Sequence, residues 1–449
     1  MITMATKNNE NIISRFLYAE ESIAPLITFR IAFGIMMFLS IARFWANGWI
    51  YTLYIQPKYF FTFYGFHFVK PLPGNGMYVV FVTLAVCALF IAAGFLYRIS
   101  SIVFFVLFTY VELIDKTNYL NHYYFISIIS FLLCLLPANR FYSVDSYIKF
   151  CPNTNTTPRW TVLTLQLQMC VVYFFAGIAK INTDWLLNAM PLKIWLTTKT
   201  ELQLIGTILS QPATAYVFSW GGMLFDVCIA FFLLNRKTVW PAYLVVVLFH
   251  VITAILFPAI GMFPFIMIVC ATIFLPTGFH QRLIGNNEMI NTKSLYSSIL
   301  TKAVLVLLFI HFTIQLLLPF RYLLYPGKLF YTEQGYRFSW RVMLMEKAGV
   351  VFFKVKDKYS NQTIEVNNSD YLTYQQEKQM STQPDMIVQF AHYLQNVYSS
   401  KMKKPEVYAE SYITINGSGS RLYIDSTVNL AAVEEGVTHK KWIITSNEY

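Results

Sequence analysis

The chain has 449 residues; it is 56% hydrophobic and 18% aromatic but only 13% charged, with a formal net charge of +11. A soluble globular protein carries charge on about 25% of its residues, so that class is excluded and a polytopic membrane protein is indicated. The net charge does not indicate a nucleic-acid partner, because no basic run or nucleic-acid-binding motif occurs. The charges lie mostly in short loops between apolar segments.

Apolar segments in the first two thirds of the chain predict about nine membrane-spanning helices. Their approximate ranges are 24–46, 76–97, 100–114, 122–138, 160–180, 216–234, 240–257, 259–276 and 299–320. Several are shorter than the roughly 20 residues that a perpendicular span needs. A re-entrant or single kinked element is therefore an open alternative for 100–114 and for the pair within 240–276. The first segment contains Arg30 and lacks a following cleavage site, so we expect it to remain as a signal anchor.

Lysine and arginine residues between the spans set the expected orientation. With the N-terminus in the cytoplasm, the cytoplasmic side holds Lys7, Arg15, Arg98, Arg140, Lys149, Arg159, Arg236, Lys237, Arg282, Lys293 and Lys302. The outer side holds Lys58, Lys70, Lys116, Lys180, Lys193 and Lys199. This bias favours a cytoplasmic N-terminus, and an odd number of spans then places the C-terminal part outside the cytoplasm. The outer connection 47–75 is rich in aromatic residues and is predicted to form an interfacial cap over the bundle.

From about Arg321 the composition becomes polar and the hydrophobic period changes. Alternating residues over 350–355, 405–415 and 421–428 predict strands, and Met380 to Met402 has helical spacing. The predicted fold is an all-α membrane bundle over residues 1–320, followed by a mainly β extracytoplasmic domain over residues 321–449. None of the six cysteines lies after residue 300, so no disulfide is expected in that domain.

The apolar run that begins near Trp160 ends in a single lysine, Lys180, set among Ile178, Ala179 and Ile181. Desolvation disfavours the ammonium form of an amine, so a lysine at the dry end of a membrane helix can act as a base near neutral pH. Lysines at helix ends also commonly extend to the lipid headgroups. The residues alone leave both interpretations open.

Other polar residues in or beside the spans are functional candidates, because placing them in a bilayer is costly. Two histidines on different spans, His122 and His250, would suffice to ligate a haem, but a histidine at a helix end more often hydrogen-bonds a neighbour. Asp115 and Lys116 are predicted to form a structural ion pair at the interface. No metal-ligand cluster or phosphate-binding loop occurs, so no metal is expected.

Three separated stretches resemble the vitamin K-dependent gamma-glutamyl carboxylases. They are Phe175–Trp185 (FAGIAKINTDW), Asp115–Tyr124 (DKTNYLNHYY) running on to Ala138–Asp145 (ANRFYSVD), and Thr332–Met343 (TEQGYRFSWRVM). The order of the stretches also matches. The likeness runs from about Ala24 to the C-terminus, so the chain resembles a bacterial member of this family with a transmembrane domain of the HTTM type.

This resemblance implies roles for individual residues. It makes Lys180 the catalytic base and gives Asn121 and His122 the hydrogen bonds to the quinol. His250, in a further family-like stretch, is assigned to the same quinol site.

The remaining implied positions support the site. Asp184 and Trp185 follow the catalytic lysine, and Trp340 and Arg341 fall at the junction of bundle and outer domain, where a peptide would enter. A packing aromatic and a headgroup-facing arginine are equally open interpretations of the last two.

The implied reaction is that of a carbon-carbon lyase. The base takes a proton from reduced vitamin K, oxidation by O2 generates a stronger base that removes the γ-proton of a glutamate, and the carbanion captures CO2. The implied cofactor is a menaquinol-type quinol, with O2 and CO2 as co-substrates. The implied partners are membrane lipid, the isoprenoid quinol and a glutamate-containing protein or peptide, with a quinone epoxide reductase as a further candidate and no nucleic acid. The implied location is the bacterial inner membrane.

The sequence also departs from the family pattern. Animal members carry a second lysine where this chain has Ala179, and their outer domain is longer, which argues against recognition of a long propeptide. Two alternatives therefore stay open: a quinol epoxidase without carboxylation, and a non-enzymatic transporter or scaffold. Against a transporter, the sequence shows no inverted repeat or pair of broken helices.

Overall fold

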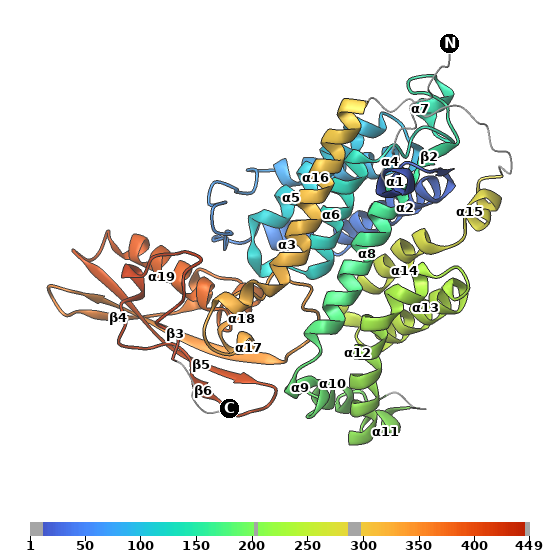
Figure 1. Cartoon of the computed structure of the whole chain (residues 1–449). Helices are drawn as coiled ribbons and strands as arrows, with labels where there is room; N and C mark the ends of the chain where they lie inside the picture. The colour runs from blue at the N-terminus through green and yellow to red at the C-terminus, as the bar shows by residue number, and fades with distance from the viewer. Residues whose placement is uncertain (1–11, 202–204, 286–297, 445–449) are drawn as a thin grey trace, which may run out of the picture.

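The computed structural model describes residues 12–201, 205–285 and 298–444, and it contains a helical bundle followed by a smaller part built on a sheet (Figure 1). The helices of the bundle are α1 (Ile12–Leu17), α2 (Ala24–Ala46), α3 (Trp49–Tyr54), α4 (Gly76–Ala93), α5 (Tyr97–Ile114), α6 (Asn121–Leu135), α7 (Val144–Tyr147), α8 (Arg159–Ala179), α9 (Thr183–Leu186), α10 (Leu192–Thr197), α11 (Gly206–Leu209), α12 (Pro212–Leu234), α13 (Val239–Leu256), α14 (Phe263–Ala271), α15 (Thr277–Leu283) and α16 (Ser298–Leu317). Strands β1 (Glu20–Ser22) and β2 (Thr156–Pro158) pair antiparallel before α2 and α8. The C-terminal part lies at the end of the bundle where α8 and α16 finish, and α9 to α11 lie at that same end (Figure 1).

Seven helices of the described residues are long and apolar enough to cross a membrane: α2, α4, α5, α8, α12, α13 and the α16 segment Ile299–Leu324. An eighth span results if Phe263–Phe274 and Thr277–Leu283, which meet at 109°, are counted together, and α6 is a shorter apolar helix. Each of the nine predicted segments thus contains a helix. The re-entrant or kinked alternative is wrong for 100–114, where α5 is a full helix, and fits only α14 and α15.

Proline explains why two predicted spans are not straight full-length helices. Leu136 precedes Pro137 at the end of α6, and Leu275 precedes Pro276 between α14 and α15. Both leucines adopt extended backbone, with ψ of 144° and 150°. The proline ring disfavours the helical conformation of the residue before it. Helix α6 therefore ends before Leu136, and the 3₁₀ turn Thr272–Phe274 that follows α14 ends before Leu275.

Glycines allow two pairs of helices in the bundle to pack with their backbones in contact. A Cβ atom at Gly34 would lie 2.6 Å from the carbonyl oxygen of Ala88 in α4, and one at Gly177 would lie 2.6 Å from the backbone nitrogen of Val227 in α12. In lipid, where burial of apolar surface between helices gives little driving force, such small residues favour close packing. Helix α8 therefore lies directly against α12.

The C-terminal part contains an antiparallel sheet in the strand order β4-β3-β5-β6. Its strands are β3 (Lys347–Asp357), β4 (Thr363–Val366), β5 (Pro405–Ile415) and β6 (Arg421–Leu422), and its longer helices are α18 (Tyr374–Met380) and α19 (Pro384–Tyr398). Every second residue of β5 is buried, and α19 packs Met386, Phe390 and Leu394 into the same core. The predicted fold class and the first two predicted strands are confirmed.

The third predicted strand, 421–428, is wrong beyond Leu422. The Asp425 carboxylate accepts hydrogen bonds from the backbone nitrogen and the hydroxyl of Thr427, at 2.9 and 2.6 Å. An aspartate that bonds the backbone two residues ahead favours a turn over a strand.

The segment after α3 joins the bundle to the C-terminal part. Phe61 is fully buried in the core of the C-terminal part, and the Tyr59 hydroxyl donates to the Gln389 carbonyl oxygen at 3.2 Å. From the bundle, the Lys116 backbone nitrogen donates to the Phe61 carbonyl oxygen at 2.7 Å. The predicted cap over the bundle therefore also fixes the position of the C-terminal part.

Candidate active site

Lys180 lies at the C-terminus of α8 and points into the bundle. Its side chain is 8% exposed, and Nζ donates to Asp226 Oδ2 at 2.6 Å and to the Ala176 carbonyl oxygen at 3.3 Å. Nζ also lies 5.4 Å from the centre of the Trp185 ring. The interpretation that this lysine extends to the headgroups is therefore wrong, because all three contacts hold the amine inside the protein.

Asp226 is the residue of this site that the sequence analysis missed. It lies in α12, its side chain is 9% exposed, and Lys180 is its ion-pair partner. The pairing depends on the close approach of α8 and α12 at Gly177, which only the fold reveals. A usable signal was nevertheless present, since Asp226 is the only charged residue in the predicted span 216–234 and such residues mark functional sites by default.

A cavity of about 440 Å³, here called the apolar cavity, opens beside the Lys180–Asp226 pair. Its walls are mostly aliphatic and aromatic side chains of α8, α12 and α13, together with Val342 and Met343. His250 also lines it; its Nε2 lies 3.1 Å from the Tyr173 hydroxyl, and its Nδ1 is buried without a hydrogen-bond partner. Throughout the described ranges, no group of three or more His, Cys, Asp or Glu side chains could hold a metal ion.

Asn121 and His122 lie at the N-terminus of α6 and line a different cavity, of about 630 Å³. Asn121 Nδ2 donates to the Arg341 carbonyl oxygen at 2.8 Å, and Oδ1 accepts from the Tyr119 hydroxyl at 3.2 Å. Among the described residues, nothing hydrogen-bonds the buried His122 ring. Asn121 thus has protein partners on both polar atoms, whereas His122 keeps its nitrogens free for a ligand.

This second cavity, here called the cationic cavity, carries an excess of positive charge. Its charged lining residues are Lys116, Lys199, Arg337, Arg341, Lys347 and Glu333. Lys347 pairs with Glu333 at 2.7 Å. Within the described part of the chain, Lys199 and Arg341 have no carboxylate partner, so the cavity favours an anionic ligand.

The two cavities share a wall. Trp195, Phe257, Phe263, Val342 and Met343 line both. The Phe263 ring centre lies 6.0 Å from that of His122 and 5.8 Å from that of His250. The predicted site residues are therefore brought to one end of the bundle but divided between two adjoining cavities.

The segment that lines the shared wall has an unusual backbone. Phe338, Trp340 and Met343 have φ of 60°, 56° and 53°, in the left-handed region that side chains other than glycine rarely adopt. Trp340 is 1% exposed and stacks on Tyr124 with ring centres 4.9 Å apart, which supports the packing interpretation of this residue. Strained backbone of this kind clusters at ligand sites.

Arg341 lies in the same segment and faces the cationic cavity. Its guanidinium group lies 4.5 Å from the centre of the Tyr322 ring, and its Nε is buried without a partner. The interpretation of Arg341 as a headgroup-facing residue is therefore wrong, because the side chain is 8% exposed and lines two internal cavities.

Asp184 and Trp185 have different surroundings. Trp185 Nε1 donates to the Ser219 carbonyl oxygen at 2.8 Å, which holds the indole beside Lys180. Asp184 Oδ2 accepts from Asn416 Nδ2 of the C-terminal part at 3.1 Å, and Asp184 does not line the apolar cavity. Trp185 therefore belongs to the site, and Asp184 ties the C-terminal part to the bundle.

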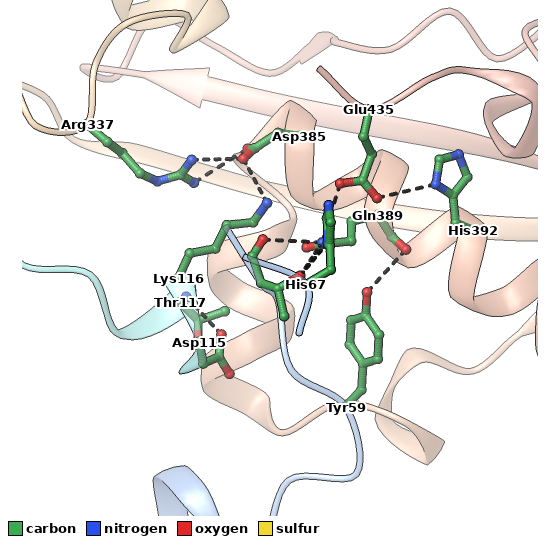
Figure 2. Close-up of polar contacts among 11 residues, drawn as sticks. Tyr59, His67, Asp115, Lys116, Thr117, Arg337, Asp385, Gln389, His392 and Glu435 are labelled. Carbon is green, nitrogen blue, oxygen red and sulfur yellow. Dashed lines mark hydrogen bonds and ion pairs between the residues drawn. The ribbon is translucent and has the colours of Figure 1, made fainter. Parts of the chain in front are cut away.

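A charged network joins the bundle to the C-terminal part beside the cationic cavity (Figure 2). Asp385 Oδ2 accepts from Lys116 Nζ at 2.9 Å and from Arg337 Nη1 at 2.8 Å. Burial raises the pKa of the Asp385 carboxyl, but the charges of Arg337 and Lys116 outweigh it and hold the pKa well below the usual range. Asp385 is therefore ionised and forms ion pairs with both Lys116 and Arg337.

The predicted ion pair between Asp115 and Lys116 is wrong. Asp115 Oδ1 accepts from the Thr117 backbone nitrogen at 2.9 Å, and Oδ2 accepts from Gln376 Nε2 at 2.8 Å, whereas Lys116 bonds Asp385. The side chains of Asp115 and Lys116 have different partners, so these residues do not pair although they are adjacent in the sequence. Burial raises the pKa of Asp115 to about 6, against the effect of its hydrogen bonds.

Comparison with known families gives two matches that together cover most of the chain. Residues 18–279 match the family described as the HTTM domain. Residues 300–449 match the family described as the vitamin K-dependent gamma-carboxylase lumenal domain. No solved structure matches the chain.

Proposed function

Since the chain belongs to the vitamin K-dependent gamma-carboxylase family, we propose that it is a membrane lyase that couples epoxidation of a reduced vitamin K-type quinol by O2 to carboxylation of glutamate with CO2. We further propose a menaquinol-type quinol, a bacterial inner membrane, a cytoplasmic N-terminus and a domain boundary near residue 320. The observation that carries the proposal is the Lys180 amine held against Asp226 beside an apolar cavity.

The buried pair supports a base at Lys180. In a dry site the neutral forms of a lysine and a carboxylic acid become competitive with the ion pair, because both charges lose their hydration. When the shared proton moves from Nζ to Asp226 Oδ2, the free amine can accept a proton from a quinol hydroxyl. The ammonium formed then stabilises the negative charge left on the ligand, while Asp226 stays neutral.

The apolar cavity fits the ring of such a quinol. Its volume of about 440 Å³ lies within the range of small-ligand sites, and its apolar walls suit an isoprenoid compound. Bound there, reduced vitamin K would supply the oxidisable hydroquinone that provides the driving force of the reaction. His250 Nδ1 has no partner among the described residues and would hydrogen-bond a quinol oxygen. Exclusion of water by these walls would protect the reactive carbanion of the substrate.

The cationic cavity is proposed to hold the glutamate. Lys199 and Arg341 would bind its carboxylate, since charge-assisted hydrogen bonds from unpaired cations are strong. The shared wall at Phe263 and Met343 would place the glutamate side chain next to the apolar cavity. His122 faces this junction, whereas Asn121 is proposed to hold the Arg341 segment in place.

The test is product analysis by mass spectrometry. Full-length protein in detergent receives reduced vitamin K or menaquinol, O2, labelled bicarbonate and a glutamate-rich peptide, alongside Lys180→Ala and the exposed-lysine control Lys70→Ala. We expect epoxide and labelled peptide from the wild type and the control, and neither from Lys180→Ala. Epoxide without labelled peptide would support an epoxidase that lacks carboxylation. If folded wild-type protein forms neither product, the proposal of an enzyme is wrong, and a non-enzymatic transporter or scaffold becomes the favoured function.

A further inference from the structure

A third cavity lies within the membrane part of the bundle, apart from Lys180. It has a volume of about 310 Å³ and is here called the aromatic cavity. Its lining residues come from α5, α6, α16 and three connecting segments: Phe63, Phe105, Thr109, Glu112, Leu113, Tyr119, Tyr124, Ser127, Ile128, Phe131, His311, Gln315 and Phe338. Neither Lys180 nor any other lysine or arginine lines it.

Glu112 is the acidic residue of this cavity. It lies in the last turn of α5, and no group within residues 12–201, 205–285 and 298–444 makes a hydrogen bond or ion pair with its carboxylate. An unpaired carboxylate at the edge of the hydrocarbon region is costly, and such residues normally face a ligand or a paired charge. A cation from outside the chain would remove this cost.

Three further polar atoms that line the cavity can accept hydrogen bonds and have no partner among the described residues. Gln315 is 4% exposed, and its Oε1 is buried without a hydrogen-bond partner while Nε2 donates to the Tyr124 hydroxyl at 2.8 Å. The hydroxyls of Thr109 and Ser127 are likewise buried and unpartnered in the described structure. Together with Glu112 they would accept several N–H donors from one ligand.

Aromatic rings form most of the remaining wall. The Phe338 ring centre lies 4.9 Å from Tyr119, 5.0 Å from Tyr124 and 5.7 Å from Phe63. The faces of such rings attract ammonium cations, as in the aromatic sites that bind quaternary ammonium groups. A carboxylate among aromatic rings thus selects an ammonium group over an anion or an apolar chain.

The position of the cavity indicates a lipid as the source of this cation. Glu112, Tyr124 and Gln315 all lie near the ends of their helices that face the C-terminal part, which is headgroup depth. Val106 of α5 and Phe309 of α16, two of the helices that line the cavity, are 54% and 74% exposed.

A cation for the phosphate of such a lipid lies in a neighbouring hollow. Phe63, Leu113 and Phe338 line both the aromatic cavity and this hollow, which Arg321 also lines. The Arg321 guanidinium lies 6.0 Å from the centre of the Phe338 ring, and its Nε is buried without a partner. Ammonium and phosphate of one headgroup therefore each find an oppositely charged residue.

We propose that the aromatic cavity binds the ammonium headgroup of a phospholipid from the leaflet next to the C-terminal part. Glu112 and the surrounding rings bind the ammonium group, and Arg321 binds the phosphate. The site is independent of the Lys180 site and of the proposed reaction.

Native mass spectrometry of the delipidated full-length protein tests this assignment. Phosphatidylethanolamine, phosphatidylcholine and phosphatidylglycerol with the same acyl chains are titrated separately, and ethanolamine phosphate serves as the headgroup without chains. We expect phosphatidylethanolamine, whose ammonium group carries N–H donors, to bind about tenfold tighter than phosphatidylglycerol. Phosphatidylcholine, which has the charge but no N–H, should bind with an affinity between the two, and ethanolamine phosphate should not bind over the same range. Glu112→Gln should abolish this preference, whereas the exposed control Glu365→Gln should keep it.

A second variant keeps the test decisive if Glu112→Gln is poorly folded by size-exclusion chromatography. Arg321→Gln should weaken all three lipids to a similar extent and leave the preference for the ammonium headgroup intact. Equal binding of phosphatidylglycerol to the wild type, or an unchanged preference in folded Glu112→Gln, would overturn the proposal. Binding of ethanolamine phosphate as tight as that of the lipids would overturn the assignment to a lipid.

Discussion

Two carboxylates near the junction of bundle and C-terminal part, the buried Asp226 and the half-buried Asp385, are held by different sets of cations. Asp226 has one partner, the amine of Lys180, in a largely apolar surrounding. Asp385 has two partners, Lys116 and Arg337. A lysine amine can release its proton, whereas a guanidinium group cannot. The Lys180–Asp226 pair can therefore become neutral when one proton moves, which a catalytic base requires. The Asp385 network keeps its charges, which suits a structural contact.

The largest effect should come from removing the charge of Asp226. Asp226→Asn keeps the shape of the side chain but ends the ion pair that fixes the position of Lys180 Nζ beside the apolar cavity, so we expect the rate of epoxide formation to fall by about 10²–10⁴. The free energy of unfolding should change less than in Asp385→Ala, because the partner left behind is an amine and not a guanidinium group. Asp184→Asn at the same end of the bundle is the matched control and should keep the rate within about threefold. Equal losses in the two variants would contradict the role given to Asp226.

Removal of Asp385 should give the opposite result. Asp385→Ala leaves Arg337 charged and without its partner, so we expect the free energy of unfolding to fall by about 3 kcal/mol, measured by urea titration in detergent. The exposed pair between Glu365 and Lys354 provides the comparison, and Glu365→Ala should cost less than about 0.5 kcal/mol. If Asp385→Ala were as stable as Glu365→Ala, the network would not hold the two parts together.

A third carboxylate, that of the buried Asp115, has hydrogen bonds but no ion-pair partner among the described residues, and it should make stability depend on pH. Its folded-state pKa is raised from 3.8 to about 6, so its contribution is fully present below pH 3.8 and is lost as the pH rises through about 6. Between pH 4 and 7 we expect the wild type to lose about 2 kcal/mol relative to Asp115→Asn. Melting curves of both proteins across this range measure the difference, and parallel curves would refute it.

The smallest effect concerns a cation without a carboxylate. Lys199→Ala should raise the KM for the glutamate peptide about tenfold, because one unpaired cation of the cationic cavity is lost. The rate of epoxide formation at saturating quinol should stay unchanged, since Lys199 does not line the apolar cavity. Lys193→Ala, a nearby lysine that bonds Tyr216, is the control. A fall in the epoxidation rate with unchanged KM would move Lys199 out of the glutamate site.

Hydropathy and local periodicity predicted most of the fold, because spans and strands each leave a pattern in neighbouring residues. The end of α6 and the bend between α14 and α15 depend on the local effect of Pro137 and Pro276, which hydropathy does not register. The third predicted strand failed because the side chain of Asp425 forms a turn.

The candidate site was less predictable, because its contacts join distant parts of the chain. Lys180 was identified from its own surroundings, but its partner Asp226 lies 46 residues away on another helix. The division of His122 and Lys180 between two cavities depends on Phe263 and on the left-handed backbone after Phe338, which leave no local pattern. The predicted ion pair between Asp115 and Lys116 was wrong for the opposite reason, because these sequence neighbours contact different partners.

The burial of Phe61 in the core of the C-terminal part also constrains the order of events during biosynthesis. The segment that carries Phe61 leaves the ribosome long before β3 and β5, so it must wait beside the membrane until the last quarter of the chain has been made. The C-terminal part completes its core only when this early segment is added. Folding of the two parts is therefore coupled, and a C-terminal fragment expressed without residues 55–69 should expose an apolar surface and aggregate.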